Sequence, residues 1–317
     1  MSSSAGKIAV LFPGQGSQFV GMGKEFLATD PAAEALMELA EKVTGFPVRS
    51  LCLDGPLEEL TRAVHLQPAI TVINLICWQA LRQAGIAPDF VVGHSLGEYS
   101  ALCAAGVLTP EDTLRLVTER GRLMEREGLK HPGGMQAVLG LTLEEVLGIL
   151  DRLTGNGTVT AANHNSEKQV VISGDFAALA EAAALVAAQG GKAIPLQVSV
   201  ANHSPLVAEA VPDFEQAMAK VVFQSPTLPV FFNVTAAEEQ EPAAIRGIMA
   251  RQIASRVRWF EIINELLARE TRIFIEVGPK TVLTGLLKKI VPKGYLYQGL
   301  QFDTPTALAD CLRKLAG

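Results

Sequence analysis

The five residues 93–97 read Gly-His-Ser-Leu-Gly and follow a short apolar run at 90–92. This is the G-x-S-x-G pattern of a nucleophile elbow, in which a serine occupies a sharp turn between a strand and a helix. Glycines are needed at both ends because a side chain there would collide with the neighbouring strand or helix. The amides that begin the following helix, expected over 98–107, point at the same place and can bind a developing oxyanion. The pattern therefore predicts Ser95 as an exposed nucleophile.

A serine hydroxyl is a weak nucleophile at neutral pH and needs a nearby base. His203 lies in a loop after an apolar strand pattern, and we expect it to be that base. His94 adjoins Ser95 and would project away from it at the turn. An α/β-hydrolase would place this histidine close to the C-terminus, yet more than a hundred residues follow His203. No acidic residue obviously partners His203, and a backbone carbonyl could equally orient its ring.

A second glycine-containing loop, Gly-Gln-Gly-Ser-Gln at 14–18, comes directly after an apolar run at 7–12. Its amides could hold an anion. The dinucleotide pattern G-x-G-x-x-G fails because Phe19 stands where the third glycine is required, and no Walker-type G-K-[ST] follows. Two interpretations stay open, an ordinary strand-to-helix turn or the second half of an oxyanion hole, and the elbow favours the second.

Arg120 is the side chain that informs on the substrate. It falls on the apolar stripe of the helix predicted over 109–127, where an unpaired guanidinium would cost several kcal/mol. Gly121 beside it would leave room for another group to approach. A structural ion pair or a snorkelling side chain would explain Arg120, and so would a bidentate grip on a substrate carboxylate. The charged face of this helix comprises Arg115, Glu119, Arg122 and Arg126, and the apolar stripe comprises Leu116, Val117, Arg120, Leu123 and Met124.

The elements that position these residues alternate between strands and helices over the first 130 residues, which predicts a parallel sheet covered on both faces. Pro68 suits the first turn of a helix, and Gly85 suits its C-terminal end. The alternation comprises a strand at 7–12, helices at 31–43 and 68–84, a strand at 90–92, and helices at 98–107 and 109–127.

From about Gly133 the order becomes βαββαβ, the ferredoxin-like unit. Sheet patterns of the first kind resume at 230–234 and 272–277, so this unit is an insertion. We therefore expect an α/β fold with a hydrolase-like parallel-sheet domain, residues 1–130 and 199–317, and an inserted ferredoxin-like subdomain, residues 131–198. The insert comprises strands at 135–139, 158–162, 169–173 and 192–198 and helices at 143–153 and 176–189.

Composition excludes several classes of protein. Of the 317 residues, 49% are hydrophobic and 19% charged, which is typical of a compact chain, and a net charge of −6 argues against a nucleic-acid partner. The longest apolar stretch, 69–81, is too short to span a membrane, and the polar start at 1–6 does not resemble a signal peptide. The cysteines are scattered in apolar surroundings, which indicates buried, reduced thiols in a cytoplasmic protein and no metal site. These cysteines are Cys52, Cys77, Cys103 and Cys311.

Taken in chain order, five motifs resemble those of the malonyl-CoA:acyl carrier protein transacylases, which serve fatty-acid and polyketide synthesis. The resemblance covers essentially the whole chain. It implies the same architecture that the element pattern predicts, a hydrolase-like α/β domain with a ferredoxin-like insert. The motifs are Phe-Pro-Gly-Gln-Gly-Ser-Gln at 12–18, Gly-His-Ser-Leu-Gly-Glu-Tyr-Ser at 93–100, Glu-Arg-Gly at 119–121, Asn-His-Ser at 202–204 and Glu-Val-Gly-Pro at 276–279.

The resemblance implies a ping-pong reaction. Ser95 would attack the thioester of malonyl-CoA while His203 takes its proton, and the thiol of an acyl carrier protein's phosphopantetheine would then collect the malonyl group. Arg120 would grip the malonyl carboxylate. No metal or organic cofactor is implied, and neither a membrane nor a nucleic acid is an expected partner.

Other residues receive supporting roles from the same resemblance. The backbone amides of Gln15 and Leu96 would form the oxyanion hole, and the Gln252 carbonyl would orient His203. Asn163 would line the cleft. Leu96, where some members have glutamine, favours malonyl over methylmalonyl. Asn202 borders the acyl pocket at a position where serine or phenylalanine is more usual, so the choice of extender unit stays open.

Three alternatives remain at this point. The chain could be a hydrolase of carrier-bound thioesters, an acyltransferase for a substituted malonyl unit, or a non-catalytic scaffold subunit. Arg120 argues against the hydrolase, and intact Ser95 and His203 argue against the scaffold. Basic residues near the C-terminus could dock an acidic carrier protein, or could be the ordinary cations of a helix end. These are Lys288, Lys289 and Lys293.

Overall fold

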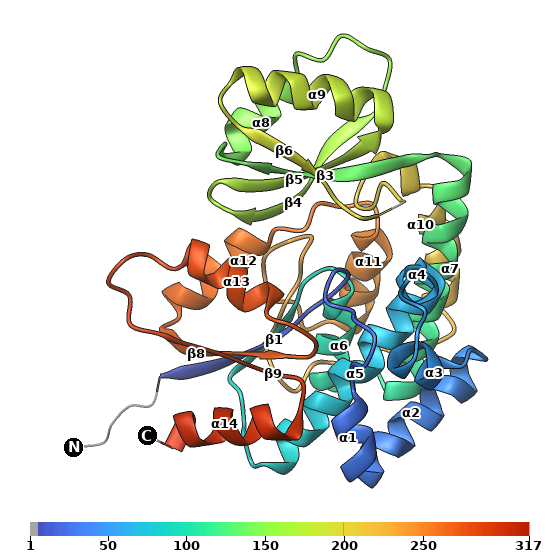
Figure 1. Ribbon diagram of the computed structural model, residues 1–317, viewed down its shortest axis with the longest axis vertical. Helices are drawn as coiled ribbons and strands as arrows, with labels where there is room; N and C mark the ends of the chain where they lie inside the picture. The colour runs from blue at the N-terminus through green and yellow to red at the C-terminus, as the bar shows by residue number, and fades with distance from the viewer. Residues whose placement is uncertain (1–5, 199, 317) are drawn as a thin grey trace.

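The computed structural model describes residues 6–198 and 200–316, and it has the α/β class that the sequence predicts (Figure 1). Within these residues, five strands form a parallel sheet in the order β7-β2-β1-β8-β9, and four form an antiparallel sheet in the order β4-β5-β3-β6. In chain order the elements are β1 (Lys7–Phe12), α1 (Lys24–Thr29), α2 (Pro31–Thr44), α3 (Val48–Leu53), α4 (Leu57–Thr61), α5 (Ala63–Gln83), β2 (Phe90–Gly93), α6 (Gly97–Ala104), α7 (Pro110–Lys130), β3 (Gly133–Leu139), α8 (Leu143–Leu150), β4 (Val159–Ser166), β5 (Gln169–Asp175), α9 (Phe176–Ala188), β6 (Lys192–Pro195), the 3₁₀ turn η1 (Pro205–Val207), α10 (Ala210–Met218), β7 (Val230–Phe231), α11 (Pro242–Gln252), α12 (Trp259–Ala268), β8 (Thr271–Val277), α13 (Val282–Ile290), β9 (Gln298–Phe302) and α14 (Pro305–Ala316).

Alternation along the strands builds two cores on the parallel sheet. Val10 and Phe12 of β1 face one side, where they join a large cluster with α2, α5, α6 and α7. Ala9 and Leu11 face the other side and pack with α12 and α13. Because successive side chains of a strand point to opposite faces, an apolar run such as β1 is buried on both.

The strand order brings the chemistry-bearing loops to one edge. From β1 the chain moves outward through β2 to β7, and then returns to the other side of β1 for β8 and β9. Because all five strands are parallel, their carboxyl ends share this edge, where doubly wound sheets bind ligands. The loops after β1, β2 and β7 carry Gln15, Ser95 and Asn233 respectively.

The antiparallel sheet has the strand order of a ferredoxin-like unit, and α8 and α9 cover one of its faces (Figure 1). Its other face carries a smaller apolar cluster that includes Met135 and Val171. A bridge between Asn163 of β4 and Val257, just before α12, ties this sheet to the rest of the protein. The predicted boundaries at 130/131 and 198/199 stay a prediction.

One helix differs from the prediction. We expected it to start at Pro68, yet α5 begins at Ala63 and carries Pro68 in its interior. The residues before the proline, Leu66 and Gln67, are buried, so their packing offsets the cost of a proline inside a helix. The pattern analysis also missed the short helices α1, α3 and α4, the helix α10, and the pair β9 and α14 at one edge of the parallel sheet.

The longer α5 also corrects the expectation about membrane length. With 21 residues it is long and apolar enough to cross a membrane, whereas the stretch 69–81 alone was judged too short. However, 78% of its most apolar window is buried inside the protein, where it packs against α2, α6 and α7. Its hydropathy is therefore accounted for by the core.

The two elbow glycines are required by close backbone contacts. A Cβ added at Gly97 would lie 2.0 Å from the carbonyl oxygen of Phe12 in β1, and one at Gly93 would lie 2.0 Å from the backbone carbon of Gly97. These distances confirm the collisions predicted from the pattern, because no real Cβ atom approaches backbone so closely. Helix α6 can pack this closely on β1 and β2 only because residues 93 and 97 have no side chain.

Gly97→Ala should lower the free energy of unfolding by at least about 2 kcal/mol, because the new methyl group must displace the β1 backbone. Urea denaturation measures the change. Gly148→Ala in α8 is the matched control: no atom lies within 4 Å of its added Cβ, so stability should stay constant or rise by up to about 1 kcal/mol. Equal stability of the two variants would contradict this account of the elbow.

Candidate active site

Ser95 occupies a strained position at the elbow. Its φ is 52°, in the left-handed region that a non-glycine residue seldom adopts. The Asn233 side chain, after β7, holds the turn: its Oδ1 accepts a hydrogen bond from the Ser95 amide at 2.7 Å, and its Nδ2 donates to the Gly93 carbonyl at 2.7 Å. Sequence analysis missed Asn233 because it lies 138 residues from Ser95 and belongs to no local pattern.

The structure brings Ser95 and His203 together. The Ser95 Oγ lies 2.7 Å from the His203 Nε2, and the His203 Nδ1 lies 3.0 Å from the Gln252 carbonyl and 2.9 Å from the Ser255 carbonyl. Two carbonyls accept only from an N–H, so Nδ1 carries the proton and Nε2 is left to accept from the serine hydroxyl. Backbone carbonyls thus stand where a catalytic triad has an acid, and the Ser255 carbonyl is an addition to the sequence prediction.

His203 is held neutral. Burial, followed by the nearby Arg120 charge, lowers the pKa of its imidazole to about 3. At neutral pH the ring therefore keeps a free lone pair on Nε2. A neutral imidazole beside a serine hydroxyl is the arrangement that general-base activation needs.

Two backbone amides lie close to the Ser95 turn and could form the oxyanion hole. Gln15 follows Gly14, whose added Cβ would lie 2.6 Å from the His94 carbonyl oxygen and 3.4 Å from the Leu96 Cβ, so the loop after β1 packs directly on the elbow. Leu96 is the N-cap of α6. Within the described residues, neither amide donates a hydrogen bond to a protein acceptor. Both are available to an oxyanion.

Arg120 lies behind the serine and is 1% exposed. Its guanidinium donates to Ser95 Oγ at 3.2 Å from Nη2 and to Gln67 Oε1 at 2.9 Å from Nη1, and it reaches Gln252 Oε1 at 3.1 and 3.3 Å. No carboxylate of the described residues forms an ion pair with it, and burial lowers the pKa of this guanidinium. The structural ion pair considered for Arg120 is therefore not present among those residues.

The neighbouring Gly121 leaves room for another group to approach, as expected. An added Cβ there would lie 2.5 Å from the Ala63 carbonyl oxygen at the start of α5. The group that approaches Gly121 is therefore the α5 backbone, and no room for a ligand is left. The expected close approach is therefore confirmed, but spacing on one helix could not reveal which group approaches.

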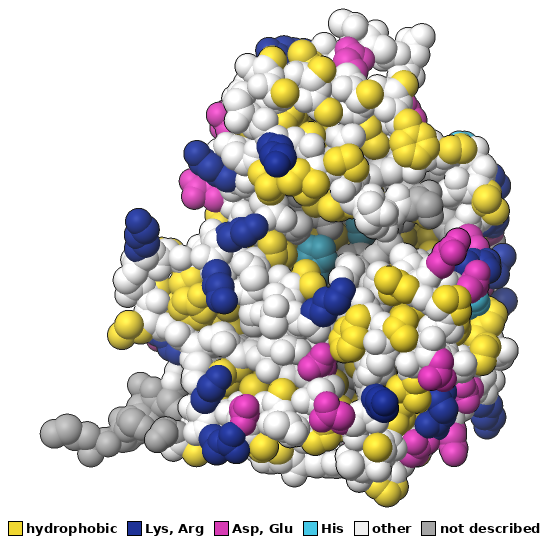
Figure 2. All heavy atoms as spheres, viewed as in Figure 1, with side chains coloured by type: hydrophobic (Ala, Val, Ile, Leu, Met, Phe, Trp, Pro, Cys, Tyr) yellow, Lys and Arg dark blue, Asp and Glu magenta, His cyan; other side chains and the backbone are white. Residues whose placement is uncertain are grey.

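A cavity of about 350 Å³ opens between the two sheets, with Ser95 and His203 in its wall. Figure 2 shows the hollow, with histidine side chains inside it and Lys or Arg side chains beside it. Asn163 of β4 and Asn202 also line it, and the Oδ1 atoms of both are buried without a donor. Arg120, Gln252 and Leu96 do not line the cavity, although each adjoins or contacts Ser95.

The predicted docking lysines occupy different places. Lys289 lines the cavity and donates to Gln169 Oε1 of β5 at 2.8 Å, which joins α13 to the small sheet. Lys288 is in the same last turn of α13, whereas Lys293 follows the helix. The position of Lys289 is therefore compatible with both interpretations, a cation at a helix end and part of a basic rim of the cavity.

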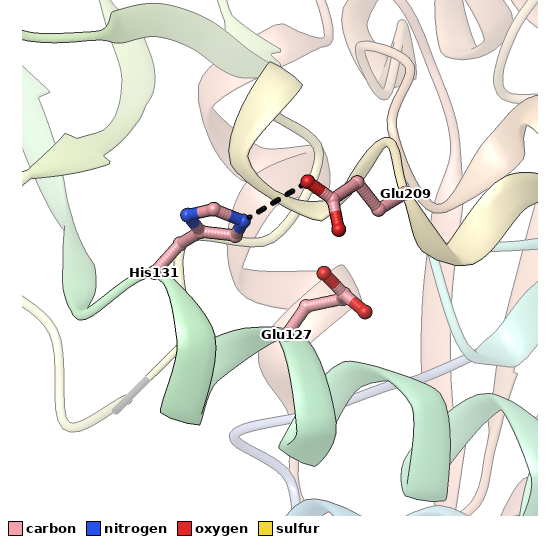
Figure 3. Close-up of side chains that lie close together, drawn as sticks. All are labelled: Glu127, His131 and Glu209. Atoms are coloured by element: carbon pink, nitrogen blue, oxygen red, sulfur yellow. Dashed lines mark ion pairs between the residues drawn. The ribbon is translucent and has the colours of Figure 1, made fainter.

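Glu127, His131 and Glu209 form a separate cluster at the end of α7 (Figure 3). Their potential ligand atoms lie within 4.8 Å of one another. Cations already neutralise both acids: Lys130 Nζ lies 3.3 Å from Glu127 and 3.2 Å from Glu209, and Arg126 lies 2.6 Å from Glu127. We interpret the cluster as an ion-pair network that joins α7 to the start of α10.

Comparison with known proteins agrees with this geometry. The acyl transferase domain family matches residues 10–296. The chain is 41% identical over 286 residues to the malonyl CoA-acyl carrier protein transacylase of Bacillus subtilis strain 168, covering 90% of each chain. The chain belongs to this transacylase family. The resemblance that the motifs indicated is confirmed.

Solved structures of family members share the fold. A malonyl-CoA:acyl carrier protein transacylase from Xanthomonas oryzae superimposes with a TM-score of 0.92 at 37% identity, covering 97% of this chain and 98% of that one. A malonyl-transacylase in complex with a type II polyketide acyl-carrier protein gives a TM-score of 0.93 at 34% identity, covering 97% and 99%. The transacylase fold therefore extends over nearly the whole chain.

The His203 ring of this transacylase should stay neutral, with the proton on Nδ1, at pH 5.5, where an ordinary imidazole with a pKa of about 6.5 is mostly protonated. A base with a lowered pKa keeps its neutral form below that ordinary value. Nitrogen-15 NMR of the imidazole groups measures both protonation and tautomer, with His203→Ala to assign the signal. A ring that is protonated at pH 6 would contradict the buried environment described above.

Proposed function

We propose that the chain transfers a malonyl group from malonyl-CoA, through an ester on Ser95, to the phosphopantetheine thiol of an acyl carrier protein. One observation carries the proposal: the Ser95 Oγ lies 2.7 Å from a neutral imidazole nitrogen and 3.2 Å from the Nη2 of a buried guanidinium. A base and a fixed positive charge thus meet at one hydroxyl. The names of the similar transacylases supply the acyl donor and the acceptor.

In the first half-reaction the Ser95 oxygen attacks the thioester carbonyl, and its proton passes to His203 Nε2. The carbonyl oxygen becomes an oxyanion, which the Gln15 and Leu96 amides stabilise. When the intermediate collapses, the carbon–sulfur bond breaks and the protonated His203 returns the proton to the sulfur. The products are CoA and a malonyl ester of Ser95.

The second half-reaction repeats these steps in reverse with a different thiol. His203 takes the proton of the phosphopantetheine thiol, whose sulfur attacks the ester, and returns it to Ser95 as the serine leaves. Gln252 and Ser255 keep the imidazole oriented in both halves through their carbonyls. CoA and phosphopantetheine are substrates, and the proposed reaction needs no metal or organic cofactor.

Arg120 selects the acyl group in this proposal. Its present acceptors are the neutral oxygens of Gln67, Gln252 and Ser95, so the buried positive charge has no direct anionic partner among the described residues. A malonyl carboxylate would supply that partner with two parallel hydrogen bonds. An acetyl group would leave the charge unpaired.

The proposal also covers the lining of the acyl pocket, the cellular compartment and the domain boundaries. Asn163 and Asn202 border the acyl group from the cavity wall, and the side chain at 202 sets which substituted malonyl units fit. The cytoplasm is the compartment, and the domain boundaries are those predicted, 1–130 with 199–317 and 131–198.

Brief mixing with malonyl-CoA should add one malonyl group to Ser95, and acetyl-CoA should add little, because only the first donor pairs with Arg120. Intact-mass and peptide mass spectrometry measure the label, and Ser95→Ala should abolish it. Methylmalonyl-CoA and ethylmalonyl-CoA complete the screen. Equal labelling by malonyl-CoA and acetyl-CoA would contradict the proposal. Faster labelling by methylmalonyl-CoA or ethylmalonyl-CoA would show that the enzyme transfers a substituted malonyl group instead. Release of free acid in the presence of a holo-carrier protein would identify a hydrolase.

Arg120→Ala should lower kcat/KM for malonyl-CoA by about 100-fold or more, because a charge-assisted bidentate pair is lost. The rate with acetyl-CoA should stay constant or rise. Arg115→Ala, on the exposed face of the same helix, is the matched control and should change neither rate. Parallel loss of both activities would assign Arg120 a purely structural role.

A further inference from the structure

Glu98 is a buried acid for which the proposed reaction has no use. It follows Ser95 by three residues, in the first turn of α6, and is 0% exposed. Each carboxylate oxygen accepts one hydrogen bond: Oε2 from the Gln252 Nε2 at 2.8 Å and Oε1 from the Asn233 amide at 2.8 Å. No cation of the described residues forms a direct ion pair with it. Burying a carboxylate costs free energy, so these contacts need a functional reason.

The Gln252 side chain links Glu98 to Arg120. Its Nε2 donates to Glu98 Oε2 and, at 2.7 Å, to the Ser95 carbonyl. Its Oε1 accepts from the Arg120 Nε and Nη2 at 3.3 and 3.1 Å. Reversing the amide would place its oxygen against two acceptors and its NH₂ against the guanidinium. The Glu98 carboxylate therefore fixes which end of Gln252 faces Arg120.

We propose that Glu98 is a positioning residue that, through Gln252, holds the Arg120 guanidinium in the orientation that receives the substrate carboxylate. This inference rests on the proposed function, because it assigns a purpose to Arg120. Glu98 touches neither Ser95 Oγ nor His203, and it acts only through Gln252 and Asn233.

Glutamine cannot replace glutamate in this network. The site presents two N–H donors, from Gln252 and from the Asn233 backbone, and a glutamine at 98 offers one oxygen and one NH₂ group. The backbone amide cannot move, so the mismatch falls on Gln252, whose own amide is then free to turn. Arg120 would lose the acceptor that holds its Nε and one Nη2 hydrogen.

The experiment compares kcat/KM for malonyl-CoA and acetyl-CoA in the full-length protein, in Glu98→Gln, Gln252→Ala and the double variant. Glu98→Gln and Gln252→Ala should each lower the malonyl-to-acetyl ratio by about 10- to 100-fold, the loss of one charge-assisted contact. The double variant should be no worse than the more affected single variant, because both changes remove the same support.

Glu276→Gln is the matched control. Glu276 is equally buried and likewise has both carboxylate oxygens hydrogen-bonded, by the Leu283 and Thr284 amides and the Thr284 hydroxyl, yet it contacts α13 and not Arg120. Its replacement should leave the ratio unchanged whatever it does to stability, which thermal unfolding measures for every variant.

Three outcomes would overturn the inference: an unchanged ratio in either single variant, equal loss of both activities in Glu98→Gln, or additive effects in the double variant. If Glu98→Gln fails to fold, the ratio of Gln252→Ala alone still decides, because the inference requires it to fall. If the wild-type protein shows no preference for malonyl-CoA over acetyl-CoA, the proposed function is rejected. Failure of the proposed function and failure of the Glu98 inference are therefore distinguishable.

Discussion

The contact between the Ser95 hydroxyl and the His203 imidazole is the interaction on which the rest of the site depends. The two residues are 108 positions apart, and each has a positive φ, 52° and 57°. Such backbone conformations cost of order 1–3 kcal/mol each and persist only where the surroundings impose them. Here Asn233 holds the serine turn, and two carbonyls at the end of α11 hold the imidazole.

Burial gives the polar groups behind Ser95 their properties. It lowers the pKa of His203 to about 3 and raises that of Glu98 to about 7, although hydrogen bonds from Gln252 and Asn233 oppose the second change. Arg120 stays in the same water-excluded space with neutral acceptors around it. A low local dielectric strengthens each of these interactions, and the proposed selection of a charged acyl group by Arg120 depends on that strengthening.

The small sheet completes the site from above. Its α8- and α9-covered face needs no partner, whereas its opposite face, with Met135 and Val171, forms a wall of the cavity. Asn163 of β4 enters the same wall, and the bridge to Val257 fixes its height above Ser95. The small sheet therefore contributes a wall to the cavity, whereas Ser95 follows β2 of the large sheet and His203 lies in the segment between β6 and η1.

Local sequence patterns were sufficient to predict the elbow and the alternation of strands and helices. Both are local: Gly93 and Gly97 are required by contacts within one strand–turn–helix unit and its neighbour β1, and the stripe of α7 that buries Arg120 follows from helical period. The ferredoxin-like order of the insert was likewise legible in the succession of its elements. The resemblance of the motifs to those of the transacylase family then added the roles expected of Gln15, Leu96 and Gln252.

The neighbours of these residues could not be predicted from local patterns, because they come from distant parts of the chain. Asn233, Gln67 and the Ser255 carbonyl belong to none of the motifs, and only folding brings them to Ser95, Arg120 and His203. Glu98 lies within the elbow motif, but its contacts with Gln252 and Asn233 could not be predicted from that motif. For the same reason Gly121 proved to serve packing against α5, since a position on one helix does not specify its neighbour. Helical or strand periodicity determines which face of an element a residue occupies, whereas the residues that pack against that face depend on the complete fold.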